Sequence, residues 1–211
     1  MTFSFLSSEE FDEQAHQLYD AGEYERALEV LREGLRRSMV DEGFDVVGEA
    51  DNGEEAVRLA AELQPDVVVL MTTSWDLLDR RWDGATTLTP LDAEYATRLE
   101  SDFRAVTDQL LTAGAGSVAW IRPPIPNVWW MNQGTGQEDP ARHAVTTAIY
   151  ADLAADRPGD VGVIPLDTWL LDAGLDDDET IRPDGVHWDP DAARRLAEDY
   201  LGERIIRVAL A

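Results

Sequence analysis

The sequence predicts an α/β fold built on a parallel sheet, and three observations lead to this expectation. Short apolar runs of strand length alternate with longer segments of helical periodicity over residues 44–200. The run at residues 67–71 is apolar without interruption, which is typical of a strand buried on both faces. The segments between the runs are long enough to hold the crossover helices that parallel strands require. We therefore expect a three-layer parallel sheet with helices on both faces.

The N-terminal residues predict a helical hairpin that precedes this sheet. Apolar side chains recur at helical spacing first around Phe11 and Leu18 and then around Leu28 and Leu31. Gly22 interrupts the two periodic stretches, as expected of a turn between helices. We assign residues 1–38 to this hairpin and residues 39–211 to the α/β domain.

Four strands are predicted along the α/β domain, at residues 44–48, 67–71, 117–121 and 161–165. Helices are predicted between and after them, with starts marked by an N-cap near Asn52, Thr89-Pro90, Asp139-Pro140 and Asp189-Pro190, and stops marked by Pro65 and Gly114. Residues 205–210 fit either a fifth strand or a frayed end. Ligand sites in parallel sheets lie at the carboxyl ends of the strands. This rule brings residues 72–74, 122–131 and 182–188 to one end of the sheet.

Composition excludes several classes of function. Acidic residues outnumber basic ones by 43 to 17, and the formal net charge is −26. Such a surface repels nucleic acid and anionic lipid, so neither is an expected partner. The chain has no cysteine, which rules out disulfides and thiolate chemistry. No apolar run reaches the ~18 residues of a membrane helix, and Met1–Glu10 does not resemble a signal peptide, so a cytoplasmic protein is expected.

Residues 8–36 resemble a single tetratricopeptide repeat. The resemblance rests on the spacing of Ala15, Gly22, Tyr24, Ala27 and Leu31, small and large residues that this repeat uses for close helix packing. It implies that the hairpin binds a protein partner. The late proline of the repeat is missing and no second repeat follows, whereas a solenoid needs about three repeats. A lone hairpin is therefore expected to pack against the neighbouring domain, and binding of a protein partner is the alternative.

Residues 31–70, LREGLRRSMVDEGFDVVGEADNGEEAVRLAAELQPDVVVL, resemble part of a response-regulator receiver domain. The resemblance covers the first helix, second strand, second helix and third strand of that family. Met71 stands where the phosphoacceptor aspartate is expected, and Asp66 belongs to the family's Pro-Asp dipeptide. The acidic pair after the family's first strand has no counterpart. Because a thioether cannot accept a phosphoryl group, receiver signalling is not expected.

Residues 65–205 resemble the later part of the SGNH hydrolase family, and in particular the SGNH domains of bacterial membrane O-acyltransferases. The most specific matching segment is RPDGVHWDPDAARRLAEDYL. In that family an Asp and a His three residues apart complete a Ser-His-Asp triad, and Asp184 and His187 match them. The resemblance implies an ester hydrolase or acyl-transfer domain that acts on a small ester without cofactor or metal. The carboxylate would fix the imidazole tautomer, so that the other ring nitrogen faces the nucleophile.

The nucleophile of that family is missing from this chain. Its Gly-Asp-Ser motif occurs nowhere in the sequence, and receiver-like residues stand where it belongs. Thr72, Thr73 and Ser74 follow a predicted strand at the correct end of the sheet and are candidate substitute hydroxyls. Solvated loop hydroxyls are the alternative, and His16 and His143 are expected to be surface histidines. The acidic residues 172–179 are expected to form a solvated loop rather than a cation site.

Two hypotheses of function follow. The first is an SGNH-like ester hydrolase or acyl-transfer domain, impaired by the missing nucleophile, with Asp184 and His187 as its catalytic residues. The second is a non-catalytic α/β protein, either an interaction module that uses the helical hairpin or a chimeric or designed chain without a selected function. The three resemblances make the chain look like a mosaic of fragments. Both α/β parent families have flavodoxin-like architecture, so the second and third fragments are compatible with one sheet.

Overall fold

The chain divides into two compact units. The computed structural model describes residues 40, 43–50, 52–72, 74–82, 86–127 and 136–211. The first unit comprises Met1–Val47 and Trp188–Glu203, and the second comprises Gly48–His187 and Arg204–Ala211. The predicted hairpin at residues 1–38 lies outside the described residues and stays a prediction.

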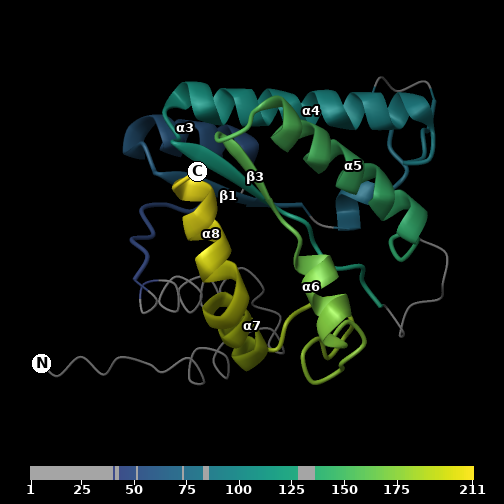
Figure 1. The fold of residues 1–211 in the computed structure, drawn as a ribbon. Coiled ribbons are helices and arrows are strands. Elements are labelled where there is room, and N and C mark those ends of the chain that lie inside the picture. Colours follow the sequence, from purple (N-terminus) through teal and green to yellow (C-terminus); the bar gives the residue numbers. More distant parts are fainter. Residues whose placement is uncertain (1–39, 41–42, 51, 73, 83–85, 128–135) are drawn as a thin grey trace, which may run out of the picture. The chain divides into compact units, whose positions relative to one another are not determined.

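The second unit is an α/β structure built on a parallel sheet, as the sequence predicts. Its three strands, β1 (Val67–Met71), β2 (Ser117–Ile121) and β3 (Val161–Ile164), lie in the order β1-β2-β3 (Figure 1). Val67 pairs with Ser117, and Val118 pairs with Val161, so the three strands start at the same end of the sheet. Every residue of β2 is buried, because this strand is central.

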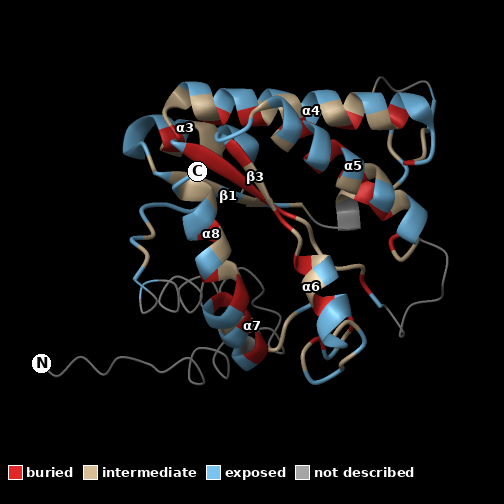
Figure 2. Cartoon of the chain, in the orientation of Figure 1, coloured by how far each residue is buried: buried red, intermediate tan, exposed pale blue. Residues whose placement is uncertain are grey.

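Three helices cover one face of the sheet and enclose the main core. They are α3 (Gly53–Leu63), α4 (Ala93–Ala113) and α5 (Pro140–Asp156). Buried and exposed positions alternate along α4 (Figure 2). Tyr95, Leu99 and Leu110 recur at helical spacing on this helix and are completely or almost completely buried. Phe103 stacks on Trp120 of β2 with 4.9 Å between ring centroids. The predicted apolar stripe of residues 95–110 therefore packs on the sheet.

The other face of the sheet carries the last helix, α8 (Gly202–Ala209), whose residues from Arg204 onward belong to the second unit. A Cβ atom on Gly162 of β3 would lie 2.4 Å from Cγ2 of Val208, so only glycine permits this close packing. Ile205, three residues earlier, is also buried. Two short helices, η1 (Ser74–Leu77) and α6 (Leu166–Ala173), follow β1 and β3.

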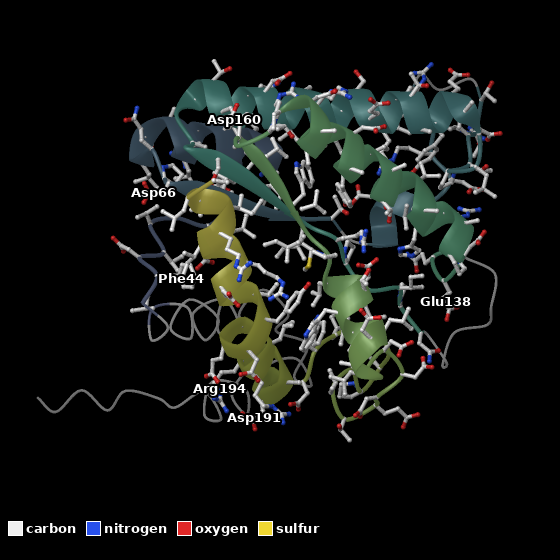
Figure 3. The ribbon with its side chains drawn as sticks, viewed as in Figure 1. Phe44, Asp66, Glu138, Asp160, Asp191 and Arg194 are labelled. Carbon is white, nitrogen blue, oxygen red and sulfur yellow. The ribbon has the colours of Figure 1, made fainter. Side chains whose placement is uncertain are left out.

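The described part of the first unit is mainly helical. Asp189 caps α7 (Pro190–Leu196) by accepting a hydrogen bond from Ala192 N at 3.1 Å, as the sequence predicts. The helix continues through η2 (Ala197–Leu201), a short stretch of wider turns, into α8. On α7, Arg194 lies 3.8 Å from Asp191 and 2.8 Å from Glu198 (Figure 3).

The structure corrects four expectations about the elements. Residues 44–48 form no strand and are not part of the described sheet, so they lack the ladder hydrogen bonds that a strand needs. Residues 205–209 belong to α8, in which Val208 contacts Gly162 of β3 and Ile205, three positions earlier, is buried. The helix α4 begins at Ala93 and not at Pro90, since the Asp92 carboxylate accepts hydrogen bonds from Thr89 N and Oγ1 and closes a turn there. The helix α6 was not expected from the sequence.

Candidate functional site

The loop after β1 is attached to the two long helices by hydroxyl and guanidinium groups. The Tyr95 hydroxyl donates to the carbonyl oxygens of Asp76 and Leu78, at 2.6 and 3.0 Å. Arg142 of α5 donates to the carbonyl oxygen of Leu77 at 2.9 Å. These contacts satisfy backbone carbonyls that no sheet or helix ladder reaches. The backbone at the carboxyl end of β1 is therefore held in place by α4 and α5.

The candidate substitute hydroxyls lie at the start of this loop. Thr72 is half-buried, and its Oγ1 is hydrogen-bonded to the hydroxyl of Tyr150. Burial raises the pKa of Tyr150 to about 12, so this phenol stays protonated at neutral pH and is not a base for Thr72. Thr73 lies outside the described residues, and only the backbone of Ser74, the first residue of η1, is described. Of these three residues, Thr72 is the one whose side chain the structure describes, and its hydroxyl is hydrogen-bonded to Tyr150.

A second loop, residues 176–187, follows α6 and is attached to the loop after β2. Asn127 N donates to the carbonyl oxygen of Gly185 at 2.9 Å, and Asn127 Nδ2 donates to Asp177 Oδ1 at 3.0 Å. Arg182 donates from one terminal nitrogen to Ile125 O at 2.9 Å and from the other to Asp176 O. The two loops are therefore joined along their length.

Arg182 is the buried centre of this junction, at 3% exposure. Burial lowers its pKa, while the carboxylates of Asp176, Asp177 and Asp184 act in the opposite direction. Its Nε has no hydrogen-bond partner among the described residues. A buried guanidinium nitrogen without a hydrogen-bond partner carries a desolvation cost. The hydrogen bonds from the two terminal nitrogens of Arg182 to carbonyl oxygens offset part of the cost of burying this side chain.

Gly185 is the point of closest approach between the two loops. Its φ is +77°, in the left-handed region that favours glycine. A Cβ atom at this position would lie 1.6 Å from the carbonyl oxygen of Asn127, which is backbone and cannot rotate away. Glycine is required here both for conformation and for space.

Asp184 and His187 come together at the end of this loop, in the pairing that the sequence predicts. Asp184 Oδ2 lies 2.6 Å from His187 Nδ1, and Oδ1 accepts hydrogen bonds from the backbone N–H groups of Val186 at 2.9 Å and His187 at 2.7 Å. Partial burial on its own would raise the pKa of Asp184. The hydrogen bonds from the His187 ring and from the two backbone N–H groups outweigh burial and hold its pKa below the ordinary value.

This geometry defines the tautomer of His187. An ionised carboxylate only accepts hydrogen bonds, so Nδ1 carries a proton and Nε2 of the neutral ring has its lone pair available. The His187 side chain is 83% exposed. No hydrogen bond joins Nε2 to a hydroxyl among the described residues. The pair is thus oriented as in the second half of a triad, with the base open to water.

The remaining candidate residues are placed less favourably for chemistry. His143, expected at the surface, is buried, and its Nε2 donates to the carbonyl oxygen of Gln137 at 2.7 Å. It is inward because it lies on the face of α5 that carries Ile149 and Tyr150. Burial lowers the pKa of His143, with hydrogen bonding to Gln137 opposing. His16 lies outside the described residues. No group of three or more metal-ligating side chains occurs within the part of the chain that the structure describes.

Several residues of this region were not singled out from the sequence. Arg182 stands two positions before Asp184 in the segment that resembles SGNH hydrolases, but its burial is not visible in a linear motif. Tyr150 and Arg142 repeat at helical spacing on α5, and nothing in that spacing shows which loop they contact. In the described residues no helix has the length and apolar character needed to span a bilayer.

Comparison with known proteins finds a local similarity to response regulators. No protein-family model matches the chain. A stretch of 43 residues is 49% identical to the response regulator GacA of Pseudomonas aeruginosa, and this match covers 20% of either chain. The GacA of Pseudomonas viridiflava matches with 46% identity over 43 residues, and the transcriptional regulatory protein YdfI of Bacillus subtilis with 45% over 42 residues.

The similarity reaches only part of these proteins. The chain covers about a fifth of the length of the curated relatives that it matches. Met71, at the position expected for a phosphoacceptor, is the last residue of β1 and is 53% exposed. The chain therefore contains a short receiver-like fragment, and this fragment forms part of an α/β unit.

Proposed function

We propose that the second unit is an impaired ester hydrolase of the SGNH type, in which His187 acts as a general base on water. The observation that supports this most strongly is the 2.6 Å contact between Asp184 Oδ2 and His187 Nδ1. It orients the imidazole and stabilises the imidazolium that forms when the ring takes a proton. The expected substrate is a small activated ester, since the loop around His187 is open to solvent.

The reaction needs only groups that the chain supplies. His187 Nε2 takes a proton from a water molecule while the water oxygen attacks the ester carbonyl carbon. The tetrahedral intermediate then collapses, the bond to the leaving oxygen breaks, and the imidazolium returns the proton to that oxygen. General-base catalysis of this kind is worth about 10²–10⁴-fold over the uncatalysed rate. Without a nucleophilic side chain, no acyl-enzyme forms.

A non-catalytic protein is the second candidate, and two observations favour it. The His187 ring is 83% exposed, whereas triad histidines work in sites that exclude water. The Thr72 hydroxyl, at the end of β1, is hydrogen-bonded to Tyr150. In this candidate Asp184 stabilises its loop and His187 takes no part in chemistry. Binding of a protein partner by the hairpin of residues 1–38 would belong to this function.

Hydrolysis of p-nitrophenyl acetate distinguishes the two candidates. We expect slow turnover without a burst in the unaltered protein, no enzymatic turnover in His187→Ala, and reduced turnover in Asp184→Asn. His16→Ala serves as a matched control, because it removes an imidazole at a position that carries no resemblance to the site. Equal rates in the unaltered protein and His187→Ala would reject the hydrolase in favour of the second candidate. A burst that disappears in Ser74→Ala would instead reveal a substitute nucleophile.

A further inference from the structure

The loop that carries His187 is attached to a segment whose backbone has little freedom. Residues 122–127, which follow β2, read RPPIPN. Each proline ring fixes its own φ near −65°, so the backbone of this segment has few alternative conformations. The segment also continues directly from β2, the strand in which every residue is buried. Residues 123–126 therefore extend a well-held part of the core to the loop of residues 176–187.

The Arg182 side chain joins this prolyl segment to the loop. Its guanidinium donates from Nη1 to the carbonyl oxygen of Ile125 at 2.9 Å and from Nη2 to the carbonyl oxygen of Asp176. The two acceptors are 57 and 6 positions away from Arg182 along the chain. A planar guanidinium donates in several fixed directions and can hold both backbones at once, whereas a lysine presents a single nitrogen.

A chain of hydrogen bonds leads from Arg182 to the His187 ring. The N–H group of Gly185 donates to the carbonyl oxygen of Arg182 at 2.8 Å and closes a turn that contains Asp184. Asp184 Oδ1 accepts from the N–H groups of Val186 and His187, and Oδ2 accepts from His187 Nδ1 at 2.6 Å. A shift of the backbone at Arg182 would therefore displace the carboxylate that orients the imidazole.

We propose that Arg182 is a positioning residue for His187, which keeps the imidazole in its Nδ1–H form by holding the loop on the prolyl segment. The His187 side chain is 83% exposed, so packing does not fix the ring and its orientation depends on the loop. A reactive side chain stays in its working geometry only when the groups that support it are themselves fixed. The effect on catalysis rests on the hydrolase proposed above, but the effect on the ring does not.

The tautomer of His187 tests this role, because a purely structural arginine would not affect it. Long-range ¹H–¹⁵N NMR distinguishes a protonated ring nitrogen from one with a lone pair. With the ring neutral, the unaltered protein should show Nδ1–H. In Arg182→Gln the contact with Asp184 should loosen, and the signal should move toward the Nε2–H form that predominates in free histidine.

Arg157→Gln is the matched control. Arg157, like Arg182, has a buried guanidinium nitrogen without a hydrogen-bond partner among the described residues, and it forms an ion pair with Asp108. It precedes β3, at the opposite end of the strands from the loops that follow them. Its substitution should lower stability, measured by urea unfolding, and should leave the His187 tautomer unchanged.

Arg182→Lys keeps the test decisive if Arg182→Gln does not fold. The lysine retains the charge and most of the aliphatic stem, but its single nitrogen cannot hold both carbonyl oxygens. We expect a shift toward Nε2–H that is smaller than in Arg182→Gln. A folded Arg182→Gln with His187 fully in the Nδ1–H form would show that the proposal is wrong. If that variant is unfolded, an unchanged tautomer in Arg182→Lys overturns it.

Hydrolysis of p-nitrophenyl acetate separates this proposal from the proposed function. In Arg182→Gln, kcat should fall about tenfold or more while KM changes little, because the base is misplaced and substrate binding is not. If the unaltered protein has no turnover but Arg182→Gln loses the Nδ1–H signal, the hydrolase is wrong and the positioning role stands. If turnover depends on His187 but kcat and the tautomer are unchanged in Arg182→Gln, the hydrolase stands and the positioning role is wrong.

Discussion

The Asp184 carboxylate stabilises its own loop as well as the histidine. One oxygen accepts two backbone N–H groups and the other accepts the His187 ring, so the loop and the imidazole share one anchor. The sequence predicted the pairing of Asp184 with His187 through a resemblance. It gave no indication that Arg182 and Gly185 fasten the same loop to residues 125–127, because those contacts join backbone atoms that are distant in sequence.

Substitution of Gly185 should release this loop. In Gly185→Ala the new methyl group overlaps the Asn127 carbonyl, and the φ of +77° is unfavourable for alanine. We expect a loss of stability of about 1–3 kcal/mol or more, measured by urea unfolding. Gly174→Ala is the control, because Gly174 has a φ of +68° with nothing within 4 Å of an added Cβ. Equal losses in the two variants would show that the contact with Asn127 is unimportant.

Tyr150 should make the protein sensitive to alkaline pH. Its pKa is raised to about 12 by burial, whereas an unfolded tyrosine ionises near 10. The unfolded state therefore loses a proton first, and the contribution of Tyr150 to stability, fully present below about pH 10, disappears as pH rises toward 12. It amounts to about 3 kcal/mol at most. Tyr150→Phe should flatten the fall in melting temperature between about pH 9 and 12, the range that the two pKa values define. If melting temperature fell equally steeply with pH in Tyr150→Phe and in the unaltered protein, this prediction would be wrong.

At the scale of the element, local sequence signals predicted where helices begin and end better than they predicted which elements contact one another. Asn52, Gly114, Asp139 and Asp189 stand at helix ends as expected, because capping depends on residues a few positions apart. The strand predicted at residues 44–48 is absent, since a strand depends on a neighbour that the local sequence does not specify. Residues 205–209 form a helix in which Val208 packs on Gly162 of β3 and Ile205, three positions earlier, is buried.

The short helix α6 offers a direct test of packing, because two adjacent leucines have opposite environments. Leu170 is completely buried, and Leu171 is 64% exposed. We expect Leu170→Ala to reduce the free energy of unfolding by about 2–5 kcal/mol, and Leu171→Ala to change it by less than about 0.5 kcal/mol. Urea unfolding of the two variants gives the comparison. Similar losses would mean that α6 is not packed as described.

At the scale of the molecule, a receiver-like fragment contributes to a sheet that lacks receiver chemistry. The carboxyl end of β1 carries Met71 followed by Thr72, and neither supplies the carboxylate that a phosphoryl group needs. The fragment supplies α3 and β1 to the core through Ala60, Val68 and Leu70. Its contribution in this chain is therefore packing.

The lack of a carboxylate at position 71 leads to an expectation about small phosphodonors. Incubation with acetyl phosphate and Mg²⁺ should leave the chain unmodified, because no acidic residue stands at the acceptor position. Met71→Asp should also stay unmodified, since the acidic pair that follows the first strand of the resembling family has no counterpart in this chain. Intact mass spectrometry measures the result. A phosphoryl adduct on an aspartate of residues 31–71 in the unaltered chain would contradict the prediction.

The sequence by itself determined the fold class, the positions of three strands and the helix ends at Asn52, Gly114, Asp139 and Asp189, because periodicity and capping chemistry act over short distances along the chain. The pairing of Asp184 with His187 was predicted through the resemblance to SGNH hydrolases. Only the tertiary structure decided that His143 is buried, that Thr72 is hydrogen-bonded to Tyr150, and that Arg182 joins two loops. Thr72 and Tyr150 are 78 positions apart, and Arg182 and Ile125 are 57 apart. Such contacts follow from how β1, β2 and the helices stack, because packing brings together groups that no local pattern relates.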